Sequence, residues 1–354
     1  MPRYTKGLMT NKKVLILAHH GIGDVIMKIP LIRFLQKTYG RTNIYITIKS
    51  NHIKETISTL ANIPSNNIFL YNGGMSGLQK ARLLGRLILK RFDTTIIPFN
   101  INQSLGKKLS KLIISKSYIA GETGNQSSHK VIQFLSPLVK EGMLQASEIQ
   151  SICDSLYTIP KIETPVHIEK LNTEKIIIHM GSGLVESHKR FSTKKIAAVI
   201  DAITNKQPHI HIALIGAKDE AEINKEITEL VTNKDNLIDY TSTLSITELC
   251  SLMQHPKSRC MISTDSGPSH LASICKLPVI SLFGPTDFEL TGPFKYATKV
   301  SLDPALDCMP CYGTEEYGIT GCGDNKCMYK ISEQAICELT FQTLQESRQE
   351  KLGS

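Results

Sequence analysis

The chain has 354 residues, of which 41% are hydrophobic and 21% charged, and a formal net charge of +9. This length predicts two domains, the composition is that of a soluble globular protein, and no apolar run approaches the roughly 20 residues that span a bilayer. The polar first 13 residues do not resemble a secretory signal, so we expect a cytoplasmic protein. The basic charge favours anionic partners, but with 6% aromatic residues and no Trp a base-stacking surface for nucleic acid is unsupported.

The first half of the chain opens with a predicted strand at 13–18, a glycine-rich turn and a helix, and a second strand follows at 43–48. The turn begins like a dinucleotide fingerprint, but Ile26 stands at its third glycine position and no acidic residue ends the second strand. Both departures from the fingerprint argue against a nicotinamide-dependent enzyme. The sequence also contains no P-loop motif. Asp24, at the helix start, is either a cap or a base that takes a proton from a substrate hydroxyl.

A basic amphipathic stretch follows at 80–91, with Lys and Arg on one helical face and Leu and Ile on another. The favoured interpretation is a solvated helix face. The alternative is peripheral contact with the anionic surface of the inner membrane.

The second half repeats the order of the first. A strand at 175–179 leads into a glycine-rich turn, a helix at 193–203 and a strand at 211–215, and the stretch 157–173 is the predicted linker. Strands that alternate with helices predict parallel sheets covered on both faces. Ligands of such sheets bind beyond the carboxyl ends of the strands, so two halves that face each other would share one cleft.

The segment 263–272 contains a strand end, a polar turn and a helix start at Asp265, Ser266 and Gly267. Free backbone N–H groups and the positive end of the helix dipole would suit a phosphate. The alternative is an ordinary capped turn in an α/β protein.

Nine cysteines in a cytoplasmic protein do not indicate a disulfide framework. Four of them cluster near the C-terminus, at Cys308, Cys311, Cys322 and Cys327. Their spacing is typical of a structural zinc or iron site, and the alternative is a loop of reduced thiols. The other five look like small core residues.

Four motifs in a fixed order resemble those of the ADP-heptose:lipopolysaccharide heptosyltransferases, glycosyltransferase family 9. They lie at 21–26 with Pro30, 179–182 with 189–191, 216–217 with 219–220, and 264–272 with 283–286. The resemblance implies a GT-B fold, in which two Rossmann-like α/β domains face each other across a cleft. The expected domains are an acceptor-side domain at 1–160, a nucleotide-sugar domain at 174–330, and a C-terminal helix at 331–354 that packs back on the N-terminal domain.

The resemblance also implies roles for individual residues. Asp24 matches the general base of the family, and Lys189 matches the lysine that meets the donor diphosphate. Ser182 is expected to contact a phosphate and Glu220 the ribose. The remaining residues implied in donor binding are Gly23, Asp265, Ser266, Gly267, Ser269 and His270, of which His270 is expected to act through packing.

The implied activity is an inverting transfer of heptose, or a related sugar, from a nucleotide-diphosphate donor such as ADP-heptose to a lipopolysaccharide core-type acceptor. No metal is implied for the chemistry. The alternatives are a heptosyltransferase with a protein acceptor and another GT-B enzyme such as a nucleotide-sugar epimerase. The chain departs from the family at Phe191-Ser192, where Trp-Pro is common, and at His19-His20, where an Arg is common. These departures bear on the donor and the acceptor more than on the reaction type.

Overall fold

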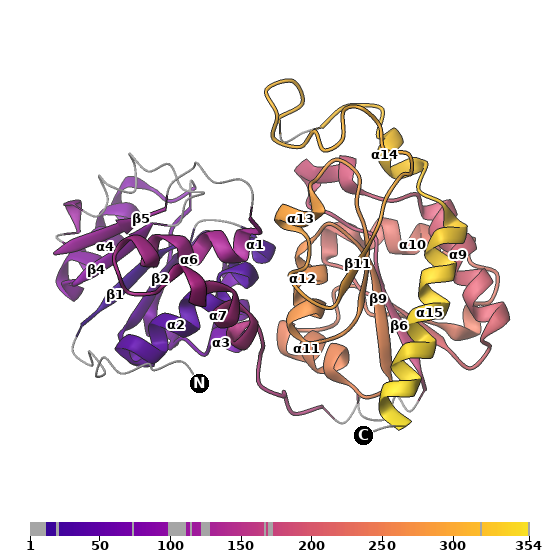
Figure 1. Ribbon diagram of the computed structural model, residues 1–354, viewed down its shortest axis with the longest axis horizontal. Helices are drawn as coiled ribbons and strands as arrows, with labels where there is room; N and C mark the ends of the chain where they lie inside the picture. Colours follow the sequence, from indigo (N-terminus) through magenta and orange to yellow (C-terminus); the bar gives the residue numbers. More distant parts are fainter. Residues whose placement is uncertain are drawn as a thin grey trace. The chain divides into compact units, whose positions relative to one another are not determined.

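The computed structural model describes residues 12–18, 21–72, 74–97, 111–113, 115–121, 128–165, 168, 173–318 and 321–352. His19 and His20, which depart from the family pattern, lie outside these ranges. The chain divides into two compact units between Ile159 and Pro160. Each unit is a parallel sheet with helices (Figure 1).

The first unit has a five-stranded sheet in the order β3-β2-β1-β4-β5, with neighbouring strands parallel. Its strands are β1 Val14–Leu17, β2 Ile44–Ile48, β3 Ile68–Leu70, β4 Thr94–Ile97 and β5 Ser117–Ala120. Its helices are α1 Ile22–Met27, α2 Ile29–Tyr39, α3 Asn51–Ala61, α4 Gly77–Lys90, α6 Lys130–Lys140 and α7 Ile149–Leu156. The central strand β1 is buried at every residue, which explains its unbroken apolar sequence.

The second unit has a six-stranded parallel sheet in the order β11-β10-β9-β6-β7-β8. Its strands are β6 Lys175–His179, β7 His211–Leu214, β8 Leu237–Asp239, β9 Ser258–Thr264, β10 Val279–Leu282 and β11 Ala297–Val300. Its α-helices are α9 Thr193–Lys206, α10 Ala221–Leu230, α11 Ile246–Gln254, α12 Gly267–Ile274, α13 Phe288–Thr291, α14 Lys326–Tyr329 and α15 Glu333–Leu352. Short 3-10 turns η4 Leu184–Lys189 and η5 Lys218–Glu220 follow β6 and β7.

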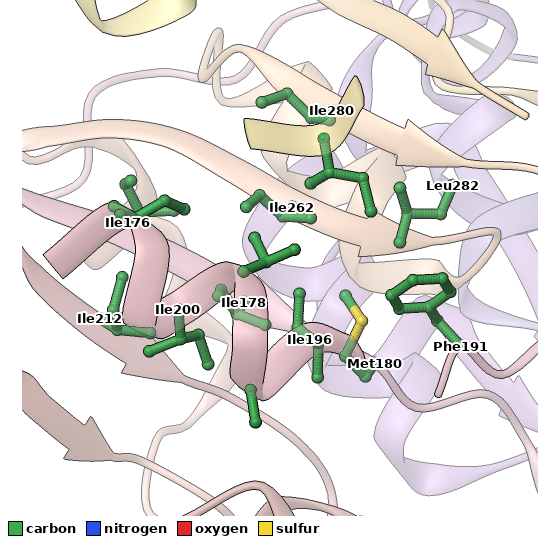
Figure 2. Close-up of a cluster of buried hydrophobic side chains, with 14 of the residues drawn as sticks. Ile176, Ile178, Met180, Phe191, Ile196, Ile200, Ile212, Ile262, Ile280 and Leu282 are labelled. Atoms are coloured by element: carbon green, nitrogen blue, oxygen red, sulfur yellow. The ribbon is translucent and has the colours of Figure 1, made fainter. Parts of the chain in front are cut away.

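The core of the second unit lies between the sheet and α9. Ile196 and Ile200 recur at helical spacing along α9, and they belong to one buried cluster with Ile178 of β6 and Ile262 of β9 (Figure 2). Phe191, which stands where the family commonly has Trp, is buried in the same cluster. The departure at this position is therefore a matter of core packing in this chain.

The C-terminal helix α15 packs against α9, β9 and β10 (Figure 1). Ile336 and Leu344 of α15 are buried in the core of the second unit. Arg348 Nη2 donates a 2.9 Å hydrogen bond to Glu174 Oε2. These contacts hold the helix to the second unit, and its predicted packing on the N-terminal domain stays a prediction. None of the helices in the described ranges is both long and apolar enough to cross a membrane.

The packing of α15 predicts that Leu344→Ala lowers the free energy of unfolding by roughly 2–5 kcal/mol, because a buried side chain is lost and a cavity remains. Gln345→Ala, one residue further along the same helix at an exposed position, should change it by about 0.5 kcal/mol or less. Urea unfolding of both variants measures the difference. Equal stabilities for the two variants would contradict the packing of α15 into this core.

Candidate active site

The predicted donor-binding residues of the second unit follow three neighbouring strands. β6 ends at His179, β9 ends at Thr264, and β7 leads into η5, which ends at Glu220. Because β7, β6 and β9 are adjacent and parallel, their carboxyl ends meet at one edge of the sheet. The sheet order thus brings together residues from three separate motifs.

A buried histidine joins two of these strand ends. His179 Nε2 lies 3.1 Å from Glu220 Oε2, and His179 Nδ1 lies 3.1 Å from Ser266 Oγ. Ser266 Oγ is also 3.2 Å from Ser263 Oγ. Sequence reasoning placed His179 in a motif without giving it a role. The available signal was a polar residue that closes an otherwise apolar strand.

Glu220 is held in place from several sides. Its Oε2 accepts a 2.8 Å hydrogen bond from the Ala217 N–H. A Cβ at position 181 would clash with Glu220 Oε1, so any larger residue there has to displace the carboxylate. Burial by itself would raise the pKa of Glu220, but the hydrogen bonds from His179 and Ala217 outweigh it and the pKa lies below its usual value. Glu220 is therefore a buried, charged carboxylate.

Lys189 lies between two carboxylates. Its Nζ is 3.1 Å from Asp265 Oδ2 and 3.0 Å from Glu186 Oε1, and its side chain is only 8% exposed. Burial would lower the pKa of Lys189, but the charges of Asp265 and Glu186 raise it above its ordinary value. The lysine therefore stays an ammonium at neutral pH, which is the state that attracts a diphosphate.

The start of α12 carries the predicted diphosphate turn. Ser266 is extended and precedes Gly267, the first helical residue. Ser269 is fully buried, and both its N–H and its hydroxyl donate to the Ser266 carbonyl. The Ser269 N–H that was expected to serve the donor is thus engaged within its own turn. His270 is buried, in keeping with its expected place in the packing.

Ser182 follows β6 and is buried beside the same edge. Its hydroxyl donates to the Glu186 carbonyl at 2.8 Å, and its own carbonyl accepts from Arg190 Nη2 at 3.0 Å. These bonds fix the loop that carries Lys189. The predicted phosphate contact of Ser182 stays a prediction.

Asp24 and Gly23 lie in the first unit, in α1. Gly21 occupies the N-cap position of α1, so Asp24 is not the cap residue that its sequence position allowed. Lys130 Nζ lies 3.8 Å from Asp24 Oδ1. Lys28 is fully buried and donates to the Asp24 carbonyl at 3.2 Å, and burial lowers the pKa of Lys28 to about 8. Asp24 therefore lies among lysines.

A basic hollow of about 620 Å³ lies in the first unit between α3, β3 and α4. Lys54, Arg82 and Arg86 line it together with amide side chains, and no acidic residue is among the described lining residues. Leu83 and Leu87, on another face of α4, are buried, so the helix shows its basic face to solvent as the sequence favoured. The hollow is suited to an anionic group.

The residues around Cys308 and Cys311, here called the cysteine segment, contact the Lys189 side of the site through Tyr312. Tyr312 Oη donates to Glu186 Oε1 at 2.6 Å, and the Tyr312 ring centre lies 4.3 Å from Lys189 Nζ. Sequence reasoning missed both Tyr312 and Glu186, since no motif includes them.

Among the residues that the structure describes, no group of three or more His, Cys, Asp or Glu side chains is arranged to hold a metal ion. The metal site predicted at the four clustered cysteines stays a prediction. Burial and the neighbouring thiols raise the pKa of Cys311, and they raise that of Cys327 to about 11. These raised pKa values keep both thiols protonated at neutral pH in the absence of a neighbouring cation, and we derive no catalytic step through a metal.

The fit around Gly181 gives a direct test. Gly181→Ala should displace the Glu220 carboxylate and lower the melting temperature, because the added Cβ needs space that Glu220 fills. Gly183→Ala is the matched control, since a Cβ there meets no atom within 4 Å. Thermal unfolding compares the two. Equal melting temperatures would show that the Glu220 position is wrong.

Known proteins resemble this chain in sequence. Residues 151–317 match glycosyltransferase family 9 (heptosyltransferase). The chain is 23% identical over 311 residues to lipooligosaccharide heptosyltransferase 2 of Campylobacter jejuni. This alignment covers 84% of this chain and 90% of that protein. It is 22% identical over 323 residues to lipopolysaccharide heptosyltransferase 1 of Campylobacter coli, with 83% and 89% covered.

Solved structures share the fold. The E. coli ADP-heptose lipopolysaccharide heptosyltransferase II matches with a TM-score of 0.71 and 16% identity, covering 95% of this chain and 99% of that one. A family 9 glycosyltransferase of Veillonella parvula matches with the same score and identity, covering 96% and 98%. These likenesses confirm the expected GT-B fold. The matched family segment and the relatives along most of the chain show that this chain is a glycosyltransferase similar to the heptosyltransferases of family 9.

Proposed function

We propose that the chain transfers heptose, or a related sugar, from ADP-heptose to a hydroxyl of a lipopolysaccharide core-type acceptor, with inversion at the anomeric carbon. The observation that carries the proposal is the buried ion pair between Lys189 and Asp265, of which Asp265 stands just before the start of α12. It sets a fixed cation beside a helix N-terminus, and both attract a diphosphate. The names of the relatives, lipooligosaccharide and lipopolysaccharide heptosyltransferases, support the sugar and the acceptor class.

In the proposed reaction the acceptor hydroxyl loses its proton to Asp24 as its oxygen attacks the anomeric carbon. The bond between that carbon and the diphosphate oxygen breaks, and ADP leaves with the electron pair. The departing diphosphate gains negative charge, which Lys189 and the backbone N–H groups at the start of α12 stabilise. Glu220 would bind the ribose hydroxyls, and Asp265 both orients Lys189 and lies near the sugar.

The proposal for Asp24 predicts that Asp24→Asn lowers the transfer rate by at least about 100-fold, because the amide cannot accept the proton. Donor affinity should stay close to that of the wild type, since Lys189 and Glu220 are unchanged. Asp154→Asn, on the exposed side of α7 in the same unit, is the control and should transfer normally. Turnover and ADP affinity are measured for both. Near-wild-type turnover of Asp24→Asn would remove Asp24 as the base.

We further propose that the basic hollow at Lys54, Arg82 and Arg86 binds an anionic group of the acceptor. Core-type acceptors carry phosphate or carboxylate groups, and the hollow offers three cations without an acidic neighbour among its described lining residues. The exposed basic face of α4 suits an acceptor held at an anionic inner-membrane surface, and we propose a cytoplasmic protein that meets this surface peripherally.

This assignment predicts that Arg82→Glu together with Arg86→Glu raises the acceptor KM by roughly tenfold or more, because attraction turns into repulsion. The donor KM should not change, and the effect should shrink as salt is added. Lys80→Glu is the control, since Lys80 lies on the same helix but does not line the hollow. Equal acceptor KM values in the control and the double variant would contradict the assignment. Mass spectrometry of the product separates a lipopolysaccharide acceptor from a protein acceptor.

A further inference from the structure

We infer that His179 is a positioning residue that couples the ribose contact of the donor site to its diphosphate contact. The inference rests on the proposed function, which gives Glu220 to the ribose and the Ser266 turn to the diphosphate. His179 touches both residues and is only 2% exposed, so it acts through them rather than on the donor itself.

The contacts of Glu220 fix the proton of the imidazole. Because the Glu220 carboxylate is charged and can only accept, the proton of a neutral His179 ring lies on Nε2 and is donated to Glu220 Oε2. His179 Nδ1 is then an acceptor, and the Ser266 hydroxyl is the donor 3.1 Å from it, although the same hydroxyl also lies 3.2 Å from the Thr264 carbonyl oxygen. Both ring nitrogens are therefore used, each by a different strand end.

This arrangement links two turns that are far apart in the sequence. Glu220 closes the turn after β7, while Ser266 opens α12 after β9, and the imidazole stands between them at the end of β6. Glu220 is confined on its other side by the Ala217 N–H and by Gly181. Loss of the imidazole would leave a buried carboxylate with one fewer donor, and it would leave the half-buried Ser266 hydroxyl with the Thr264 carbonyl, 3.2 Å away, as its acceptor. Either change would displace its turn.

Two substitutions separate the two halves of the bridge. The amide of Asn lies near the position of Nδ1 in histidine, so His179→Asn keeps a partner for Ser266 and releases Glu220. The amide of Gln lies near the position of Nε2, so His179→Gln keeps a partner for Glu220 and releases Ser266. A purely structural residue would give no such division between the two turns.

The experiment measures binding of ADP and of adenosine, together with donor KM and kcat, in both variants. We expect His179→Asn to weaken both ligands roughly tenfold, because the ribose side is lost. We expect His179→Gln to weaken ADP by a similar factor while adenosine binding stays unchanged. The donor KM should rise in both variants while kcat changes little. His211→Asn, at the opposite end of the neighbouring strand β7, is the control and should behave as wild type.

Double variants make the coupling quantitative. Adding Glu220→Gln to His179→Asn, or Ser266→Ala to His179→Gln, should weaken ADP less than the two single effects together. Unchanged ADP binding in both single variants, or strictly additive double variants, would overturn the inference.

Two measurements on the wild-type protein distinguish a failure of this inference from a failure of the proposed function. If wild-type protein does not bind ADP, the proposed function itself fails. If it binds ADP and the variants do not fold, the nitrogen-15 NMR shifts of the wild-type His179 ring decide. They should show a ring that carries a proton at Nε2, and a ring protonated at Nδ1 alone would overturn the bridge.

Discussion

A charged carboxylate can be buried only where hydrogen-bond donors surround it, and this requirement shapes the edge of the second sheet at which β6, β7 and β9 end. Glu220 meets it with His179 and the Ala217 N–H, in a space that Gly181 leaves open. The parallel order β7-β6-β9 brings these residues together from separate parts of the chain. The apolar strands therefore have two roles, since they form the core and also set the spacing of the polar groups at their ends.

A second set of charges lies along the same edge. Lys189 is held by Asp265 and Glu186, and Tyr312 bonds Glu186 from the cysteine segment. Buried pairs of this kind contribute little net stability, but they keep a cation in one place before any ligand arrives. In the proposed reaction this preorganisation is what stabilises the departing diphosphate. The cysteine segment then affects the site through Tyr312.

Much of the fold and part of the site could be predicted from sequence, for different physical reasons. Apolar runs such as β1 and β6 reveal buried parallel strands, and the ordered motifs indicated that Lys189, Glu220 and Asp265 belong to one site. The roles of His179 and Tyr312 depend on contacts between distant segments, which local patterns do not contain. The place of Leu344 in the core of the second unit could not be predicted either, because an apolar residue does not show which core it joins.

In the proposed function a nucleotide binds at the carboxyl ends of β6, β7 and β9. Hydrogen–deuterium exchange with and without saturating ADP tests it most directly, since ordered backbone amides at the bound site exchange more slowly. Protection should appear at 179–183, 216–220 and 264–269, and the basic hollow around Arg82 should be unchanged. Protection at that hollow with no change at the three strand ends would contradict the account.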